Sequence, residues 1–305
     1  MTAGRERDYV SVCVCTYQRP ALLAKLLDAL DEQLTGDAFS FEVVIVENDR
    51  RRSSEALVLE RAARTRVPVR YDCEPERNIS LARNRTVRDA RGNLIAFIDD
   101  DERPGRDWLR SLHRTLRDSG ADGVLGPVMP EFPADAPGWL KDGRVFERPR
   151  HETGTRIGSR DARTGNVLLN RSLFVDGETW FDSTLGRTGG EDTDFFARQR
   201  AQGHVFVWCD EAVTYETIPS ERWSASFHLR RMWRSGTISG ERVRSGLLSP
   251  AFLVRIGLLL GGCLLAAPVS VLLSKHRRMK VALKAAYCCG VVTAALGWSA
   301  LRNRE

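Results

Sequence analysis

Three consecutive aspartates, Asp99, Asp100 and Asp101, follow the apolar segment 94–98 and precede Glu102. Neighbouring carboxylates repel each other, so such a cluster at the end of a strand usually persists because a cation or hydrogen bonds offset the repulsion. A magnesium-type ion is typically held by one or two carboxylates, with phosphate and water oxygens as its other ligands. The cluster therefore predicts a Mg²⁺ or Mn²⁺ site that takes part of its ligands from a nucleotide substrate.

A second acidic pair, Glu191 and Asp192, follows two glycines and opens a segment with helical periodicity. Glycine lets the backbone approach a ligand closely, and a positioned carboxylate can take the proton of an attacking hydroxyl group. Asp192 is therefore the candidate catalytic base, and Glu191 is expected to orient an acceptor or to pair with a cation. Helix capping and the helix dipole also favour acidic residues at a helix start, so local helix stabilisation is the alternative explanation.

The elements that must position these residues follow a β-α-β pattern from Val10 to Val128. Short β-branched runs alternate with segments of helical period, which is typical of an α/β protein with a mostly parallel sheet. We expect strands at 10–15, 41–46, 67–73, 94–98 and 124–128, and helices after Pro20, at 55–64, from a cap at Ser80 to Gly92, and at 105–118. In open sheets of this type ligands bind beyond the carboxyl ends of the strands, which is where the aspartates lie.

The rest of the chain has a less regular pattern. Residues 130–163 are rich in proline, glycine and charge and are predicted to form a long loop. A strand at 166–169, a helix from Glu191 to about Gln202 and strands at 205–208 and 212–216 follow. We therefore predict a nucleotide-binding half at 1–128, an acceptor-binding half with the candidate base at 129–245, and a membrane-associated helical hairpin at 246–305.

Two apolar stretches, 256–273 and about 281–301, end the chain and are separated by the basic link Ser274–Lys280. The first has about eighteen uncharged residues, the lower limit for crossing a bilayer. Basic residues lie on both sides of it, so the positive-inside rule gives no consistent orientation for a single span. We expect a hairpin at the cytoplasmic face of the membrane, with basic residues at anionic headgroups; a pair of core helices is the alternative.

The charge distribution limits the choice of partners. The chain carries +6 in total and residues 251–305 carry +7, which leaves −1 for the first 250 residues. A nearly neutral body disfavours nucleic acid as a partner. The polar N-terminus lacks an apolar signal core, and the seven scattered cysteines are interpreted as reduced thiols. The body is therefore expected in the cytoplasm.

Several motifs, in this order, resemble family 2 glycosyltransferases of the GT-A fold, and most closely bacterial exopolysaccharide transferases of the succinoglycan glucosyltransferase type. The resemblance covers about 10–236 and is carried by segments 12–20 (VCVCTYQRP) and 42–49, Arg83-Asn84, the three aspartates, Thr164-Gly165-Asn166 and segment 189–192 (GGED). It implies an inverting enzyme that moves a sugar from a nucleoside-diphosphate donor, expected to be UDP-linked, to a glycan or lipid-linked acceptor in polysaccharide or glycoconjugate synthesis.

The resemblance also implies roles for residues at the matching positions. Thr16, Glu47 and Arg83 would contact the nucleoside, although the family commonly has aspartate where this chain has Glu47. Asp99 would lie near the ribose, with Asp100 beside it in the donor site. Asp101, together with Asp99, would bind the divalent metal.

Two other functions remain as alternatives. A nucleotidyltransferase would share the fold, the metal and the nucleotide, but it commonly begins with a glycine-rich loop, and the first turn at 16–20 contains no glycine. A catalytically inert membrane-bound scaffold would keep the fold without the chemistry. The presence of Asp99, Asp101 and Asp192 together disfavours the scaffold.

Overall fold

The structure is a computed structural model that describes residues 7–159, 161–174, 177, 179–246, 248–270 and 274–298. The chain divides into two compact units: unit 1 comprises Met1–Pro130 and Arg148–Thr217, and unit 2 comprises Glu131–Glu147 and Ile218–Glu305. Residues 148–217 return to unit 1, so the segment 129–245 is not a compact unit of its own. Its assignment as an acceptor-binding half remains a prediction.

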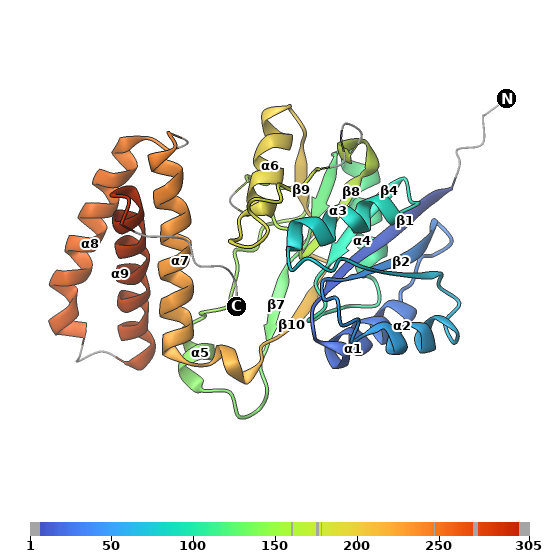
Figure 1. The fold of residues 1–305 in the computed structure, drawn as a ribbon, viewed down its shortest axis with the longest axis horizontal. Helices are drawn as coiled ribbons and strands as arrows, with labels where there is room; N and C mark the ends of the chain where they lie inside the picture. The colour runs from blue at the N-terminus through green and yellow to red at the C-terminus, as the bar shows by residue number, and fades with distance from the viewer. Residues whose placement is uncertain are drawn as a thin grey trace. The chain divides into compact units, whose positions relative to one another are not determined.

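Unit 1 is built on a seven-stranded sheet in the order β3-β2-β1-β4-β8-β6-β9 (Figure 1). The strands are β1 (Asp8–Thr16), β2 (Phe39–Glu47), β3 (Val69–Cys73), β4 (Leu94–Ile98), β6 (Gly123–Leu125), β8 (Asn166–Asn170) and β9 (Phe206–Trp208). β1 pairs in parallel with β2 and β4, β2 with β3, and β6 with β9, whereas β8 is antiparallel to both β4 and β6. The predicted α/β class is confirmed, and the reversed direction of β8 is an addition that periodicity did not reveal.

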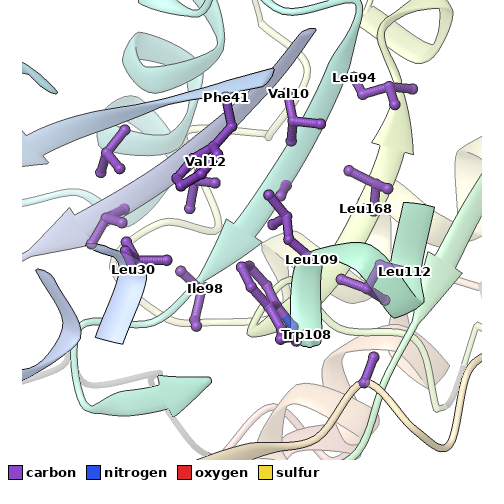
Figure 2. Close-up of a cluster of buried hydrophobic side chains, with 14 of the residues drawn as sticks. Val10, Val12, Leu30, Phe41, Leu94, Ile98, Trp108, Leu109, Leu112 and Leu168 are labelled. Atoms are coloured by element: carbon purple, nitrogen blue, oxygen red, sulfur yellow. The ribbon is translucent and has the colours of Figure 1, made fainter. Parts of the chain in front are cut away.

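Side chains alternate across the sheet and build a hydrophobic core on each face. Val10 and Val12 of β1 pack in one cluster with Leu30 and Trp108 (Figure 2), whereas Cys13 belongs to the cluster on the other face. The first cluster is formed with α1 (Pro20–Asp31), α2 (Glu55–Ala62) and α4 (Trp108–Ser119), and the second with α3 (Ile79–Asp89) and α6 (Glu191–Ala201). Helices on both faces fix the parallel strands in register.

The N-terminus of α3 corrects one prediction. Asn78, not Ser80, caps this helix: its side-chain oxygen accepts hydrogen bonds from the backbone N–H groups of Ser80 and Leu81. The Ser80 hydroxyl instead donates to the carbonyl of Asp182, 2.8 Å away. Asparagine is an equally good cap, so local sequence did not separate the two residues.

A second, three-stranded sheet has the order β5-β10-β7, with β5 at Glu102–Pro104, β10 at Thr214–Thr217 and β7 at Val128–Glu131. The strand predicted at 124–128 is therefore wrong as one element, because its two ends belong to different sheets. Residues 130–163 are mainly irregular, as predicted, apart from the end of β7 and the short helix α5 (Gly138–Asp142). The 3₁₀ turns η1 (Arg171–Phe174) and η2 (Ser220–Arg222) complete the connections.

Unit 2 contains three long helices, α7 (Ala225–Arg244), α8 (Pro250–Ser270) and α9 (Lys275–Ala295). Lys275–Lys280 forms the beginning of α9, so the predicted link is mostly helix rather than a connection. Gly236 of α7 lies against the backbone of Tyr287 on α9, where a Cβ atom would be 2.1 Å from a carbonyl oxygen. The apolar part of α9 therefore packs on α7.

One helix among the described residues is long and apolar enough to cross a membrane, Ala251–Pro268 in α8, with mean hydropathy 1.9 and 11% of the segment buried. The ends of the two predicted apolar stretches, 271–273 and 299–301, lie outside the described residues. The helical hairpin expected at the C-terminus is present as α8 and α9, which contact each other.

Candidate active site

The carboxyl ends of β1, β2 and β4 lie at one edge of the sheet because these strands are parallel. Thr16 ends β1 opposite Glu47 at the end of β2, and Asp99 directly follows β4. β1 lies between β2 and β4, so the strand order changes direction at β1, and such a switch point leaves a crevice at the carboxyl edge. The sheet therefore gathers the predicted donor-site residues at the place where α/β folds bind ligands.

The antiparallel strand β8 brings Gly165 to the same edge, because Asn166 pairs with Ile98 immediately before Asp99. A Cβ atom at position 165 would lie 2.8 Å from Glu102 Oε1 and 3.1 Å from Asp99 Oδ2. A larger residue at this position would press on both carboxylates and make at least one of them shift.

Arg19 and Thr16 hold the second and third aspartates. The Nη1 of Arg19 donates to Asp100 Oδ1 at 3.1 Å and to Asp101 Oδ2 at 3.0 Å, and the Thr16 hydroxyl donates to Asp100 Oδ2 at 2.8 Å. Burial is the largest influence on Asp100 and, with the nearby charges of Asp101 and Asp99, it raises the pKa of Asp100 to about 6 despite the opposing effect of Arg19. Asp100 is thus held by hydrogen bonds within the protein, and its pKa lies close to neutral pH.

Arg83 of α3 connects the two acidic groups of the site. Its Nη1 donates to Glu191 Oε1 at 2.6 Å, and its Nη2 lies 4.0 Å from Asp99 Oδ1. The side chains of Arg83 and Glu191 are buried, whereas half of the Asp99 side chain is exposed. Burial lowers the pKa of Arg83, but the charges of Glu191, Asp99 and Asp192 outweigh this effect and raise it. A permanent positive charge therefore joins α6 to the end of β4.

Glu47 is fully buried and is held by its neighbours. Its carboxylate accepts hydrogen bonds from the Ser53 hydroxyl at 2.6 Å, the Ser54 backbone N–H at 2.9 Å and the Tyr71 hydroxyl at 2.7 Å. These bonds fix the turn after β2. A nucleoside contact through Glu47 remains a prediction, as it does for Thr16 and Arg83.

Asp192 stands in the first turn of α6, after two glycines with positive φ, Gly189 at 93° and Gly190 at 100°. Residues other than glycine rarely adopt this conformation. Asp192 is half-buried, and among the described residues its carboxylate accepts hydrogen bonds from Thr193 alone. Asp192 directly follows Glu191, the partner of Arg83, and its charge contributes to raising the pKa of both Arg83 and Asp99.

Sequence reasoning assigned no role to Glu102 and Arg148. Glu102 is buried opposite Glu216 in the β5–β10 pair, and burial followed by the charge of Asp99 raises its pKa well above the usual value. Glu102 Oε1 has no hydrogen-bond partner among the described residues. Arg148 pairs with Glu216 at 2.9 Å and offsets this crowding. The sequence signal was the fourth acid in the run, which continues onto a second sheet.

A narrow recess near this edge has an accessible volume of about 20 Å³, enough for about one water molecule. Its lining includes Arg148, Arg163, Asn166 and Trp208. Asn166 is firmly held, since it accepts a hydrogen bond from the Trp108 indole and donates to two backbone carbonyls. The recess therefore has one rigid wall and two cationic side chains.

The donor set suits a hard divalent cation, because Asp99 and Asp101 offer only oxygen ligands. Asp101 Oδ2 already attracts a cation, the guanidinium of Arg19. No group of three or more His, Cys, Asp or Glu side chains in the described part of the chain is arranged to hold a metal by itself. The residues therefore fit an ion that two carboxylates hold and that completes its shell with phosphate and water oxygens.

Known proteins resemble this chain in sequence and in structure. The family described as "Glycosyl transferase family 2" matches residues 11–176. The succinoglycan biosynthesis protein ExoM of Rhizobium meliloti (strain 1021) is 34% identical over 300 residues, which cover 96% of this chain and 94% of ExoM.

Two solved structures resemble the whole chain. The mannosyltransferase PcManGT from Pyrobaculum calidifontis, in complex with GDP-Man and Mn²⁺, has a TM-score of 0.64 and 19% identity and covers 95% of this chain and 87% of its own. TarS 1-349 from S. aureus, in complex with UDP-GlcNAc, has a TM-score of 0.54 and 17% identity, with coverage of 95% and 92%. At these identities the likeness concerns the fold, and it confirms the fold class predicted from the sequence.

Proposed function

Because the chain belongs to glycosyl transferase family 2, we propose that it moves a sugar from a nucleoside-diphosphate donor to a glycan or lipid-linked acceptor, with inversion at the anomeric carbon. The relationship to ExoM supports a role in the synthesis of a bacterial polysaccharide or glycoconjugate. The chain is a glycosyltransferase by family; the donor, the acceptor, the metal and the stereochemistry are the proposal.

One observation supports this proposal most strongly: Arg83 links Asp99, after β4, with the acidic start of α6. The guanidinium bonds to Glu191 at 2.6 Å and lies 4.0 Å from Asp99, and Asp192 acts on both Arg83 and Asp99. Asp99, our proposed donor-site acid, and the start of α6, which carries our proposed base, are thus linked through Arg83 at an edge suited to nucleotides.

In the proposed reaction Asp101 and Asp99 would hold a Mg²⁺ or Mn²⁺ ion, which would supply Lewis-acid stabilisation of the charge that develops on the departing nucleoside diphosphate. Asp192 takes the proton of the acceptor hydroxyl as its oxygen attacks the anomeric carbon from the face opposite the leaving group. Arg83 and Glu191 keep the first turn of α6 in place beside the donor site.

The nucleoside is expected to contact the residues that end β1 and β2. We propose Thr16, Asp100 and Arg83 as donor-site residues, with Glu47 fixing the turn that faces the base. The relatives with known complexes carry different nucleotides, GDP-Man and UDP-GlcNAc. We propose UDP as the nucleotide of the donor, with GDP as the alternative.

A screen of UDP- and GDP-sugars with Mn²⁺ tests this function. We expect one donor to release its nucleoside diphosphate, and Asp101→Asn to lower that rate by about 10²-fold, because the metal contributes several kcal/mol of charge stabilisation. Asp107→Asn, which removes an exposed carboxylate paired with Arg110, is the matched control and should keep the wild-type rate. Release of pyrophosphate would instead indicate a nucleotidyltransferase, and inactivity with every donor and membrane lipid extract would indicate a scaffold.

We further propose that the enzyme attaches to the cytoplasmic face of the membrane through α8. Leu258, Leu264 and Leu265 are 65–81% exposed, an unusual number of large apolar side chains in contact with solvent on one helix. The following helix begins with Lys275, Arg277, Arg278 and Lys280, which suit anionic headgroups. Whether α8 lies in the surface or spans the bilayer is part of the same test.

Co-sedimentation with vesicles of phosphatidylethanolamine and phosphatidylglycerol measures this attachment. The double variant Leu258→Lys/Leu265→Lys should lose sedimentation with vesicles, since each lysine costs about 2.5–3.5 kcal/mol at the centre of an inserted helix. Leu59→Lys, on the exposed face of α2 in unit 1, is the control and should sediment like the wild type. Protease protection of tagged ends in sealed vesicles separates a span from a surface helix, and undiminished sedimentation of the double variant would contradict the proposal.

A further inference from the structure

Arg19 is the only residue of the 16–20 turn that bridges two of the clustered aspartates in the described structure. One nitrogen, Nη1, contacts both Asp100 and Asp101 at 3.1 and 3.0 Å. The Arg19 side chain is 40% exposed, whereas those of Asp100 and Asp101 are 6% and 8% exposed. The guanidinium therefore covers the two carboxylates from the solvent side.

The backbone of Arg19 is held at the start of α1, whereas its side chain is partly exposed and is held by the two aspartates. Arg19 is the N-cap residue of α1 and precedes Pro20, whose ring sets the first helical turn. The carbonyl of Arg19 accepts the backbone hydrogen bonds of Leu22 and Leu23. A move of the guanidinium thus needs side-chain rotation at a partly exposed site and the loss of its contacts with Asp100 and Asp101, but no change in the backbone.

The contact with Asp101 conflicts with metal binding. Asp101 Oδ2 is 3.0 Å from a permanent positive charge, and a divalent ion on the same carboxylate would be repelled by that charge. Either the ion binds weakly or Arg19 leaves. The diphosphate of a donor offers the Arg19 guanidinium an alternative partner, because arginine pairs with phosphate oxygens through two parallel hydrogen bonds.

We propose that Arg19 is a placeholder cation and a donor-phosphate ligand. In the donor-free protein it balances charge at Asp100 and Asp101, and when the donor arrives it transfers to a phosphate oxygen and no longer competes with the divalent ion at Asp101. This inference rests on the proposed function. It makes binding of the metal and of the nucleotide mutually dependent, since each strengthens the other by the same factor.

The test titrates Mn²⁺ into the full-length protein with and without UDP or GDP and follows free Mn²⁺ by electron paramagnetic resonance. Without nucleotide, Arg19→Gln should bind Mn²⁺ about tenfold more tightly than the wild type, because the competing charge is gone. With nucleotide, the gain in Mn²⁺ affinity should be large in the wild type and small in Arg19→Gln.

Three further variants separate charge from shape and from folding. Arg19→Lys keeps the charge and should resemble the wild type without nucleotide. Arg19→Ala should also bind Mn²⁺ more tightly than the wild type without nucleotide, so the proposal can still be tested if one of the two variants folds poorly. Arg61→Gln removes another arginine of unit 1, paired with Asp28 on the surface, and should leave Mn²⁺ binding unchanged.

The two proposals fail in different ways. Unchanged nucleotide-free Mn²⁺ affinity in Arg19→Gln and Arg19→Ala, beside metal-dependent transfer by the wild type, would overturn the placeholder role alone. Tighter Mn²⁺ binding in these variants without transfer from any donor would support the placeholder role and reject the proposed function.

Discussion

Replacing Asp192 by asparagine should lower the rate of sugar transfer by about 10³-fold and leave donor affinity within about twofold of the wild type. Asparagine keeps an oxygen that can accept the hydrogen bond from the Thr193 backbone N–H, now 2.7 Å long, so the first turn of α6 should persist. What the variant loses is the capacity to take a proton from the acceptor hydroxyl. Transfer rates at saturating acceptor, together with donor titration by calorimetry, measure the two effects separately.

The matched control lies two residues further along the helix. Asp194 pairs with Arg198 at 2.8 Å on the surface of α6, so Asp194→Asn changes the same residue type in the same helix away from the donor site. Its transfer rate should stay within about twofold of the wild type, since exposed pairs of this kind contribute little. Near-normal transfer by Asp192→Asn would exclude Asp192 as the base, and equal losses in both variants would indicate damage to the helix instead.

Replacing Arg83 by methionine should lower the free energy of unfolding by about 3–5 kcal/mol, because removal of one partner leaves the buried Glu191 without its guanidinium. The two side chains are 9% and 3% exposed, so water cannot replace the lost contact at 2.6 Å. Urea denaturation followed by circular dichroism measures the change. Donor binding should weaken too, because Arg83 also lies 4.0 Å from Asp99.

Two comparisons make the Arg83 result specific. Arg85→Met, on the same helix but paired at a more exposed site with Asp72 and Glu74, should cost less than about 1 kcal/mol. The double variant Arg83→Met/Glu191→Gln should be more stable than Arg83→Met alone, since it also removes the buried negative charge that Arg83 balances. If the single variants at Arg83 and Arg85 lose similar stability, the Arg83–Glu191 pair is not the connection we describe.

Much of unit 1 was predictable because its signals are local. Short β-branched or apolar runs identified β1, β2 and β4, a helical period identified α1, and the parallel connections placed the three aspartates at the carboxyl edge of the sheet. The errors arose where local signals were equal or divided. Asn78 and Ser80 are both good caps, and the run at 124–128 supplies strands to two sheets.

The C-terminal region shows the same limit. Two apolar stretches were evident from the sequence, but only α8 has a mostly exposed apolar segment, whereas α9 buries Cys288, Gly290, Val291 and Ala294. Amino-acid composition does not predict which face of a helix packs against another helix. The glycines at 236, 240 and 290 make the close contact of α7 with α9 possible, and their effect depends on both helices.

The sequence by itself determined the kinds of groups in the site and the sheet edge at which the first of them lie: oxygen ligands after β4, a threonine after β1 and an acid after two glycines. Only the tertiary structure decided their partners. Arg19 meets Asp100 and Asp101 across 81 and 82 residues, and Arg83 meets Glu191 across 108. Spacing along a chain encodes local periodicity, whereas the partner of a charge depends on which distant segments the folded sheet and helices bring within a few ångströms.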